Sequence, residues 1–184
     1  MRQKIDGYAQ QYLREIVQHF RPYFGEMTLS NEAAVFAAPP QPLSRVRIFN
    51  KQNKQLFGGI YSLQVVGEID RPELTAVKAP IQIFYRGFIK KGQAYFRQKQ
   101  DAFSEFVQRL NGHQELIATL TQLDLEFGVI RAVTGKYLVQ LAPLGGSYLY
   151  MTFPPLRYPG VISKREISGL VQALRQLSLI LQAI

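Results

Sequence analysis

The side chains that most often catalyse reactions or hold metals are scarce in this chain of 184 residues. The chain has no cysteine, which excludes thiolate nucleophiles, thiolate metal sites and disulfides. Its two histidines, His19 and His113, have no carboxylate at the spacing of a shared metal site. We interpret His19 as a solvated helix residue and His113 as a loop residue, and we expect neither a metal nor a cofactor.

Two glycine-containing segments look like catalytic or phosphate-binding loops but have the wrong surroundings. Residues 145–147, Gly-Gly-Ser, lack the G-x-S-x-G spacing of a nucleophile elbow. Residues 134–136, Thr-Gly-Lys, lie between two expected strands, whereas a phosphate loop precedes a helix. Asp124 and Glu126 are able to pair as acid and base, but two carboxylates on a strand edge are usually solvated surface. We therefore assign no catalytic residue, and an enzyme is the less favoured class.

Positive charge is the strongest chemical signal, because the formal net charge is +9. The excess is concentrated between Leu43 and Lys99, where the acidic residues are Glu68, Asp70 and Glu73. A clustered basic surface attracts phosphate backbones, anionic lipids or an acidic protein. The plainer explanation is that Lys and Arg keep a hydrophobic protein in solution.

The basic residues coincide with segments of strand-forming sequence. Residues 81–89 and 94–99 form an expected hairpin closed at 90–93, and aromatic residues accompany its cations. The leading hypothesis is a non-enzymatic protein whose basic ribbon contacts an anionic partner, nucleic acid first. The residues assigned to that contact are Arg45, Arg47, Arg86, Lys90, Lys91, Tyr95, Arg97 and Lys99.

Part of this ribbon is similar to a known RNA-binding motif. Residues 91–98 partly match the RNP1 motif of RNA-recognition domains. Gln93 and Gln98 stand where that motif has aromatic residues, and the preceding strand enters through a hairpin. We reject the RNA-recognition fold and keep the ribbon as a nucleic-acid candidate on its own terms.

The elements that must position these residues are clearest in the last third of the chain. Apolar residues alternate along residues 125–129, 137–141 and 149–153, which predicts three strands with one face in a core. Glycines favour turns at 134–135 and 145–146. Ser163 and Glu166 have capping-box spacing, and apolar residues then repeat at helical spacing to Leu181.

The first two thirds predict a helix, several strands and a helix pair. A helix over residues 5–20 ends before Pro22, and residues 45–49 form a strand with a basic outer face. Residues 50–54 read as a polar loop, and 57–66 as a strand entered through a bulge at two glycines. Asp101 is an expected N-cap for a helix ending at residues 111–112, and a second helix covers 114–123.

The order of these elements favours an α+β class with an antiparallel sheet and its helices gathered on one face, because most strand pairs lack a crossover helix. The helix-then-meander order occurs twice, which hints at a degenerate duplication. The length favours one domain over 1–184, with subdomains 1–100 and 101–184 as the alternative.

The C-terminal third resembles an uncharacterised bacterial family. The resemblance rests on residues 141–147, Leu-Ala-Pro-Leu-Gly-Gly-Ser, on residues 153–158, Phe-Pro-Pro-Leu-Arg-Tyr, and on the closing helix. It implies a stand-alone bacterial protein in the cytosol, and it carries no activity or catalytic residue. The polar start of the chain and the lack of a long apolar run agree with a cytoplasmic location and no transmembrane segment.

Three further interaction hypotheses stay open. Prolines in residues 153–160 would hold Arg157 and Tyr158 in a rigid interaction loop. The end of the last helix is apolar around most of its circumference, so it is either core or a homodimer contact that makes the chain an assembly module. A small-ligand binder or enzyme would use the outer sheet face. Its cleft residues would be Tyr148, Tyr150, Arg131 and Lys136.

Overall fold

The computed structural model of the chain describes residues 2–30, 32–76, 79–86, 92–98 and 105–183. The helices are α1 (Arg2–Gln18), α2 (Arg21–Phe24), α3 (Glu105–Gly112), α4 (Gln114–Gln122) and α5 (Lys164–Ala183). The strands of the first half are β1 (Thr28–Leu29), β2 (Ala33–Phe36), β3 (Arg45–Gln55), β4 (Gly58–Asp70), β5 (Ile81–Tyr85) and β6 (Ala94–Gln98). Those of the second half are β7 (Leu125–Val133), β8 (Lys136–Pro143), β9 (Tyr148–Thr152) and β10 (Pro155–Pro159).

The strands form a single antiparallel sheet that bends around its long central strand, β4. The sheet order is β1-β2-β3-β4-β8-β7-β5-β6, and every strand pair in it is antiparallel. The C-terminal part of β4 pairs with β8, whereas its N-terminal part pairs with β9, which in turn pairs with β10. The expected α+β class with an antiparallel sheet is confirmed.

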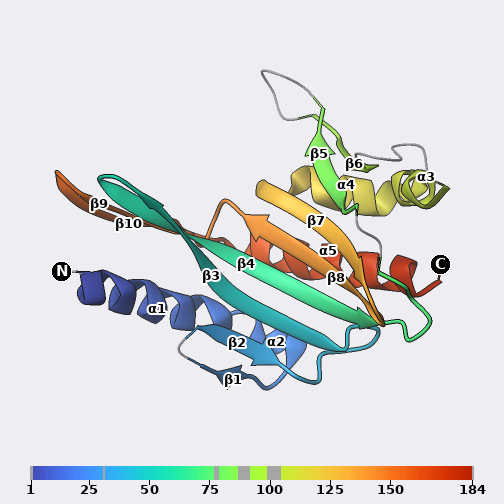
Figure 1. Cartoon of the computed structure of the whole chain (residues 1–184), viewed down its shortest axis with the longest axis horizontal. Helices are drawn as coiled ribbons and strands as arrows, with labels where there is room; N and C mark the ends of the chain where they lie inside the picture. The colour runs from blue at the N-terminus through green and yellow to red at the C-terminus, as the bar shows by residue number, and fades with distance from the viewer. Residues whose placement is uncertain (1, 31, 77–78, 87–91, 99–104, 184) are drawn as a thin grey trace.

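The helices lie on one face of this sheet. Helix α5 runs behind β4 and β8, α4 lies beside it, and α1 lies at the end where β3 is found (Figure 1). Burial alternates along β3, where Val46 and Ile48 are buried and Arg45 and Arg47 are exposed. The buried residues of β3, β4 and β8 join those of α1 and α5 in one hydrophobic cluster. Period-two alternation thus separates a helix-covered face from a helix-free face.

One end of the sheet projects as a four-stranded extension, which we call the arm (residues 50–61 and 148–159). In the arm the long β3–β4 hairpin is paired, through β4, with the β9–β10 hairpin. The two hairpin ends lie together at the end of the molecule where α1 begins (Figure 1). Helix α1 supports the helix-covered face of the arm, where Tyr61 and Tyr148 pack with Ala9.

Two segments expected as loops are strands, and both belong to the arm. Residues 50–54 continue β3, because each of them pairs with a residue of β4 from Leu63 to Gly59. Residues 155–159 form β10, an edge strand that tolerates Pro155 and Pro159 because it needs donors on one side only. Gly58 and Gly59 lie in regular pairing with β9, and a Cβ at Gly58 would lie 2.2 Å from the Tyr150 carbonyl oxygen.

Turns and helix ends follow the expected local chemistry. Gly135 and Gly146 have φ angles of 79° and 77°, the left-handed region that glycine adopts without strain. The Glu166 carboxylate accepts a hydrogen bond from the Ser163 N–H at 2.8 Å, and Glu166 N–H donates to Ser163 Oγ at 3.1 Å. This reciprocal pair is the capping box expected at the start of α5. Helix α1 ends at Gln18, and Pro22 lies in the first turn of α2.

Several predicted residues lie outside the described part of the chain. They are Lys90 and Lys91, expected to close the β-hairpin, Lys99, and the expected N-cap Asp101. Among the described residues, no helix combines the length and the apolar character needed to cross a bilayer.

Candidate anion-binding face of the sheet

One row of cross-strand partners crosses the helix-free face from β3 to β6. Its members, in strand order, are Arg47, Val66, Gln140, Val129, Gln82 and Arg97. The row begins and ends with a cation whose side chain is exposed. Arg45 lies on the same face as Arg47, two residues earlier on β3, and pairs across the strand with Glu68. The sheet therefore places cations at both ends of one face.

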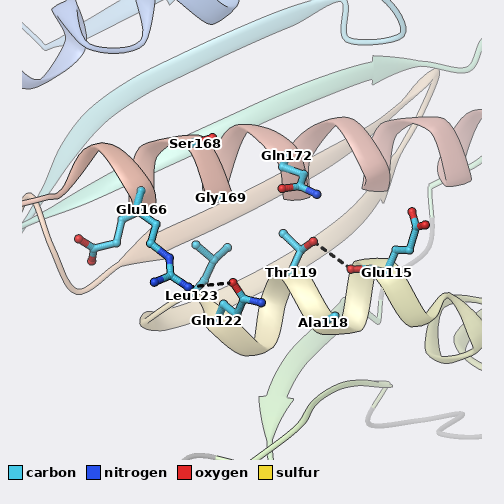
Figure 2. Close-up of a pocket in the computed structure, with 10 residues that line it drawn as sticks. Glu115, Ala118, Thr119, Gln122, Leu123, Glu166, Ser168, Gly169 and Gln172 are labelled. Atoms are coloured by element: carbon cyan, nitrogen blue, oxygen red, sulfur yellow. Dashed lines mark hydrogen bonds between the residues drawn. The ribbon is translucent and has the colours of Figure 1, made fainter.

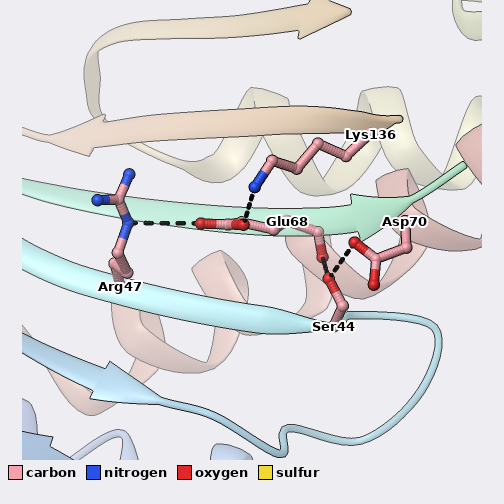
Figure 3. A network of polar contacts seen from close by, with 5 residues as sticks. All are labelled: Ser44, Arg47, Glu68, Asp70 and Lys136. Atoms are coloured by element: carbon pink, nitrogen blue, oxygen red, sulfur yellow. Dashed lines mark hydrogen bonds and ion pairs between the residues drawn. The ribbon is translucent and has the colours of Figure 1, made fainter. Parts of the chain in front are cut away.

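At the β3 end, a buried carboxylate lies between two cations (Figure 3). The Glu68 side chain is 7% exposed, and one of its oxygens accepts a hydrogen bond from Lys136 Nζ at 2.7 Å. Its other oxygen lies 3.5 Å from Arg47 Nε. The two cations are 44% and 37% exposed, so each combines a partner with access to solvent. One negative charge here offsets part of the charge of two basic residues.

The polar groups around this carboxylate are also paired. Ser44 Oγ donates to Asp70 at 3.0 Å at the end of β4 (Figure 3). Further along the face, Arg131 donates to the Gln140 amide oxygen at 2.7 Å, and Gln140 donates to the buried Gln64 at 2.8 Å. These bonds connect β7, β8 and β4 and fix the side chains in the middle of the face.

At the β6 end, cations accompany aromatic rings. The Phe84 and Tyr95 rings stack with centroids 5.8 Å apart, and the Arg86 guanidinium lies 5.7 Å from the centre of the Tyr95 ring. Arg97, two residues after Tyr95 on the same face of β6, is exposed. Within the described residues, no carboxylate forms an ion pair with Arg86 or Arg97. The β6 end thus offers unneutralised charge next to flat rings.

Helices α3 and α4 hold this end of the sheet from the opposite face. Tyr85 of β5 donates its hydroxyl to the carbonyl oxygens of Leu120 and Leu123, both at 3.1 Å. Burial raises the pKa of this hydroxyl, and the charge of Asp124 acts in the same direction. Asn111 accepts from Phe96 N–H at 2.8 Å and donates to its carbonyl at 3.0 Å. The β5–β6 ribbon is therefore anchored to the helices.

The predicted binding residues form two groups on this face. Arg45 and Arg47 are separated from Arg97 by five strand spacings, or about 24 Å along a flat sheet. Sequence reasoning did not assign Lys136, Arg131 and Phe84 to this group of residues. Alternation would have placed each of them on an outer face, but the strand order that brings them beside the predicted residues has no local signal.

Arg157 and Tyr158 lie on opposite faces of the arm. They are consecutive residues of β10, so strand alternation separates their side chains. The Arg157 guanidinium lies 4.4 Å from the centre of the Tyr8 ring of α1. Tyr158 pairs with Leu149 on the helix-free face and is exposed. The two residues thus lie in a strand, and their side chains project to opposite sides of it.

The residues of the other two hypotheses are also placed by the fold. Tyr148 and Tyr150 face Tyr61 and α1 on the helix-covered side, away from Arg131 and Lys136. Leu177 and Leu181 of α5 are fully buried in the core of the chain itself, whereas Leu179 is exposed. The apolar end of the last helix is thus mostly used within the fold.

A pocket lies between α4 and α5, on the helix side of the molecule (Figure 2). It has a volume of about 600 Å³, and Gly169 allows the close approach of Leu123 at its floor. Several polar groups around it already have partners: Thr119 donates to the Glu115 carbonyl, and Glu166 caps α5. The Thr119, Gln122, Arg165 and Glu166 side chains at this pocket are thus engaged within the chain itself.

Comparison with known proteins identifies a family but no activity. Residues 18–181 match the model of a family described as "Protein of unknown function (DUF3156)". This match covers most of the chain and extends well beyond the C-terminal third that carried the resemblance. Comparisons with curated proteins and with solved structures gave no match.

Proposed function

We propose, from the premise that the chain belongs to this family of unknown function, that it is a non-enzymatic binding protein for an anionic partner, with nucleic acid as the first candidate. The partner would lie across the helix-free face of the sheet. One observation carries the proposal: Arg45, Arg47, Arg86, Tyr95 and Arg97 all lie on that single face.

The charge balance of the face supports an anionic partner. Its described strands present Arg45, Arg47, Lys51, Arg97, Arg131 and Lys136, and the carboxylates between them are those of Glu68 and Asp70. The span of about 24 Å between its two ends equals about seven base pairs of duplex at 3.4 Å each. A nucleic acid backbone is long enough to contact both ends at once.

The rings at the β6 end favour nucleic acid over other anions. Tyr95 and Phe84 are half-buried and lie next to Arg86 and Arg97. Exposed aromatic rings beside cations are the surface on which unpaired bases stack. We therefore expect single strands to bind more tightly than duplexes. Bacterial origin and a cytoplasmic location stay predictions from the sequence.

The test is affinity for mixed-sequence DNA and RNA, single-stranded and duplex, over about 50 to 200 mM salt. Binding through phosphate contacts releases counterions, so the logarithm of the affinity should fall linearly with the logarithm of the salt concentration. We expect a slope of about −3 to −5, from the described cations of the face. No binding at low salt, or binding without a salt slope, would contradict the proposal.

A further inference from the structure

The arm exposes large apolar side chains at the ends of both of its hairpins. Leu56 and Phe57 form the β3–β4 turn and are 88% and 61% exposed. Phe153, at the end of the β9–β10 hairpin, is 80% exposed. The Thr152 N–H and hydroxyl both donate to the Phe57 carbonyl, at 2.8 and 3.0 Å, so the two hairpin ends are joined. Their apolar side chains belong to one surface.

This apolar surface continues along the helix-free face of the arm. Ile60 pairs with Leu149, which pairs with Tyr158, and Met151 pairs with Leu156 in the neighbouring row. Strand alternation places all five side chains on the same face, and Met151, Leu156 and Tyr158 are exposed. We call the combined surface the arm patch. Its members are Leu56, Phe57, Ile60, Leu149, Met151, Phe153, Leu156 and Tyr158.

The charge around the arm patch has a single sign. The arm contains Lys51, Lys54 and Arg157, and its sequence contains no aspartate or glutamate. Asp6 of α1 touches the arm, but it accepts a hydrogen bond from Tyr61 on the helix-covered face. Strand alternation places Lys51 on the face of the patch and Lys54 and Arg157 on the opposite face, and the arm itself supplies no acidic side chain.

We infer that the arm patch docks onto the surface of a bilayer that contains anionic lipids. Leucine, phenylalanine and tyrosine side chains partition into the boundary between headgroups and acyl chains. Lys51 and Lys54 lie a few residues before the β3–β4 turn and are exposed, so they would contact the lipid phosphates, and each adds attraction to an anionic surface. The two joined hairpin ends would enter the boundary, and the rest of the sheet would stay in water.

The same features disfavour two other occupants. A second copy seated on the patch would bring Lys51, the arm cation on the face of the patch, against the same basic surface of the other copy, and like charges repel. A nucleic acid strand could use Phe57, Phe153 and Tyr158 for stacking, but it would leave Leu56, Met151 and Leu156 exposed to water. A surface of anionic lipids uses the apolar side chains and the cations together.

The first experiment is flotation of the intact chain with vesicles of phosphatidylcholine that contain about one third phosphatidylserine. The variant Phe57→Ser/Phe153→Ser removes two exposed rings, so we expect it to fold normally and to bind these vesicles at least about tenfold more weakly. The matched control Leu29→Ser/Leu144→Ser removes two exposed apolar side chains outside the arm and should bind like the unmodified chain. Vesicles of phosphatidylcholine alone should bind more weakly.

Fluorescence gives a second readout, because the chain contains no tryptophan. Phe153→Trp places a single tryptophan at the end of the arm, and Tyr95→Trp places one at the β6 end of the sheet. We expect anionic vesicles to shift the emission of the first probe to shorter wavelength and to leave the second unchanged. Single-stranded DNA should change the emission of the second probe alone. The two probes thus separate failure of this inference from failure of the proposed function.

Four results would overturn the inference. The first is that the unmodified chain does not bind anionic vesicles, and the second is that it binds them no better than Phe57→Ser/Phe153→Ser. The third is that vesicles change the emission of the tryptophan at position 95 but not of that at position 153. The fourth is that Phe57→Ser/Phe153→Ser loses DNA binding but keeps vesicle binding. Sedimentation provides a further check. A dimer of the unmodified chain that dissociates in Phe57→Ser/Phe153→Ser would identify a second copy as the occupant and would also overturn it.

Discussion

Arg47 and Arg97 occupy the two ends of the same cross-strand row, yet their surroundings differ. Arg47 lies 3.5 Å from the buried Glu68 carboxylate, which also binds Lys136. Arg97 has no ion-pair partner within the described residues; it pairs across the strands with Gln82, and Tyr95 precedes it by two residues on the same face of β6. Within the described residues, the same residue type on the same face is therefore partly neutralised at one end and has no ion-pair partner at the other. A single buried carboxylate decides how much of the charge is available to a partner.

The largest effect should come from removing the two groups of cations separately. We expect Arg86→Ala/Arg97→Ala to lower the salt slope of nucleic acid binding by about 2, and the affinity at low salt by about 100-fold. Arg45→Ala/Arg47→Ala should lower the slope by about 1, because Glu68 already offsets Arg47. Titrations across a salt series measure both values.

The control for these doubles is Arg14→Ala/Lys164→Ala, which removes two exposed cations from the helices. It should change the slope by much less, since neither residue lies on the helix-free face. If the double variants at the two ends of the sheet lowered the salt slope equally, Glu68 would not distinguish the two ends. Equal losses for the control would show that net charge alone drives binding.

A smaller effect should follow from removing the carboxylate itself. Glu68→Gln leaves Arg47 and Lys136 without their shared anion, so we expect affinity for nucleic acid to rise several-fold and the salt slope to increase by about 1. Because both cations are more than a third exposed, water screens the loss, and the free energy of unfolding should fall by only about 1–2 kcal/mol. Denaturant unfolding and DNA titration test the two parts.

Glu105→Gln serves as the matched control, because Glu105 pairs with Arg109 on the surface of α3. Surface ion pairs contribute little to stability, so the free energy of unfolding of this variant should fall by no more than about 0.5 kcal/mol, and its affinity for nucleic acid should not change. If Glu68→Gln bound nucleic acid no better than the unmodified chain, the inference that Glu68 partly neutralises the cations of the β3 end would be wrong.

The smallest effect should come from loosening the β6 end. Tyr85→Phe removes the hydrogen bond to the end of α4, and we expect a loss of about 1 kcal/mol at neutral pH. Burial raises the pKa of this hydroxyl above its usual value near 10, so its contribution is complete below about pH 10 and is lost as the pH rises further. The free energy of unfolding, measured from neutral to alkaline pH, should fall less for Tyr85→Phe than for the unmodified chain.

Tyr158→Phe removes an exposed hydroxyl instead and should change stability at neutral pH by no more than about 0.5 kcal/mol. The affinity of Tyr85→Phe for nucleic acid provides a second measurement. A modest loss of affinity in Tyr85→Phe would show that the β6 end requires a rigid ribbon. If the free energy of unfolding of Tyr85→Phe fell as steeply at alkaline pH as that of the unmodified chain, the role of Tyr85 would be contradicted.

Much of the fold was predictable from local sequence. The strands β7, β8 and β9 and the capping box at Ser163 and Glu166 were predicted from local patterns, and the structure has all of them. The predicted core face is right for β8 and wrong for β9, where Leu149 and Met151 lie on the helix-free face and Tyr148 is the buried residue. The loop expected at residues 50–54 was wrong because these residues are polar on both faces. In the arm β3 lies away from the core, so its pairing with β4 imposes no apolar alternation.

The arrangement of the candidate site was less predictable. Alternation showed that Arg45 and Arg47 face outward, but no local signal showed that β8 and β7 lie between β4 and β5. That order places Lys136 beside Glu68 and separates Arg47 from Arg97. Long-range strand order depends on contacts between residues far apart in sequence, such as Glu68 and Lys136, which periodicity does not encode.

The double hydrogen bond between Asn111 and Phe96 limits how this protein can associate. The last strand of the sheet, β6, has the N–H and C=O of Phe96 occupied by a side chain from α3, and Thr121 of α4 accepts from Ala94 N–H. Strand β1, at the opposite end of the order, is only two residues long. Blocked and very short edges resist addition of strands from other molecules. Fibril-like growth from these two edges is thereby suppressed.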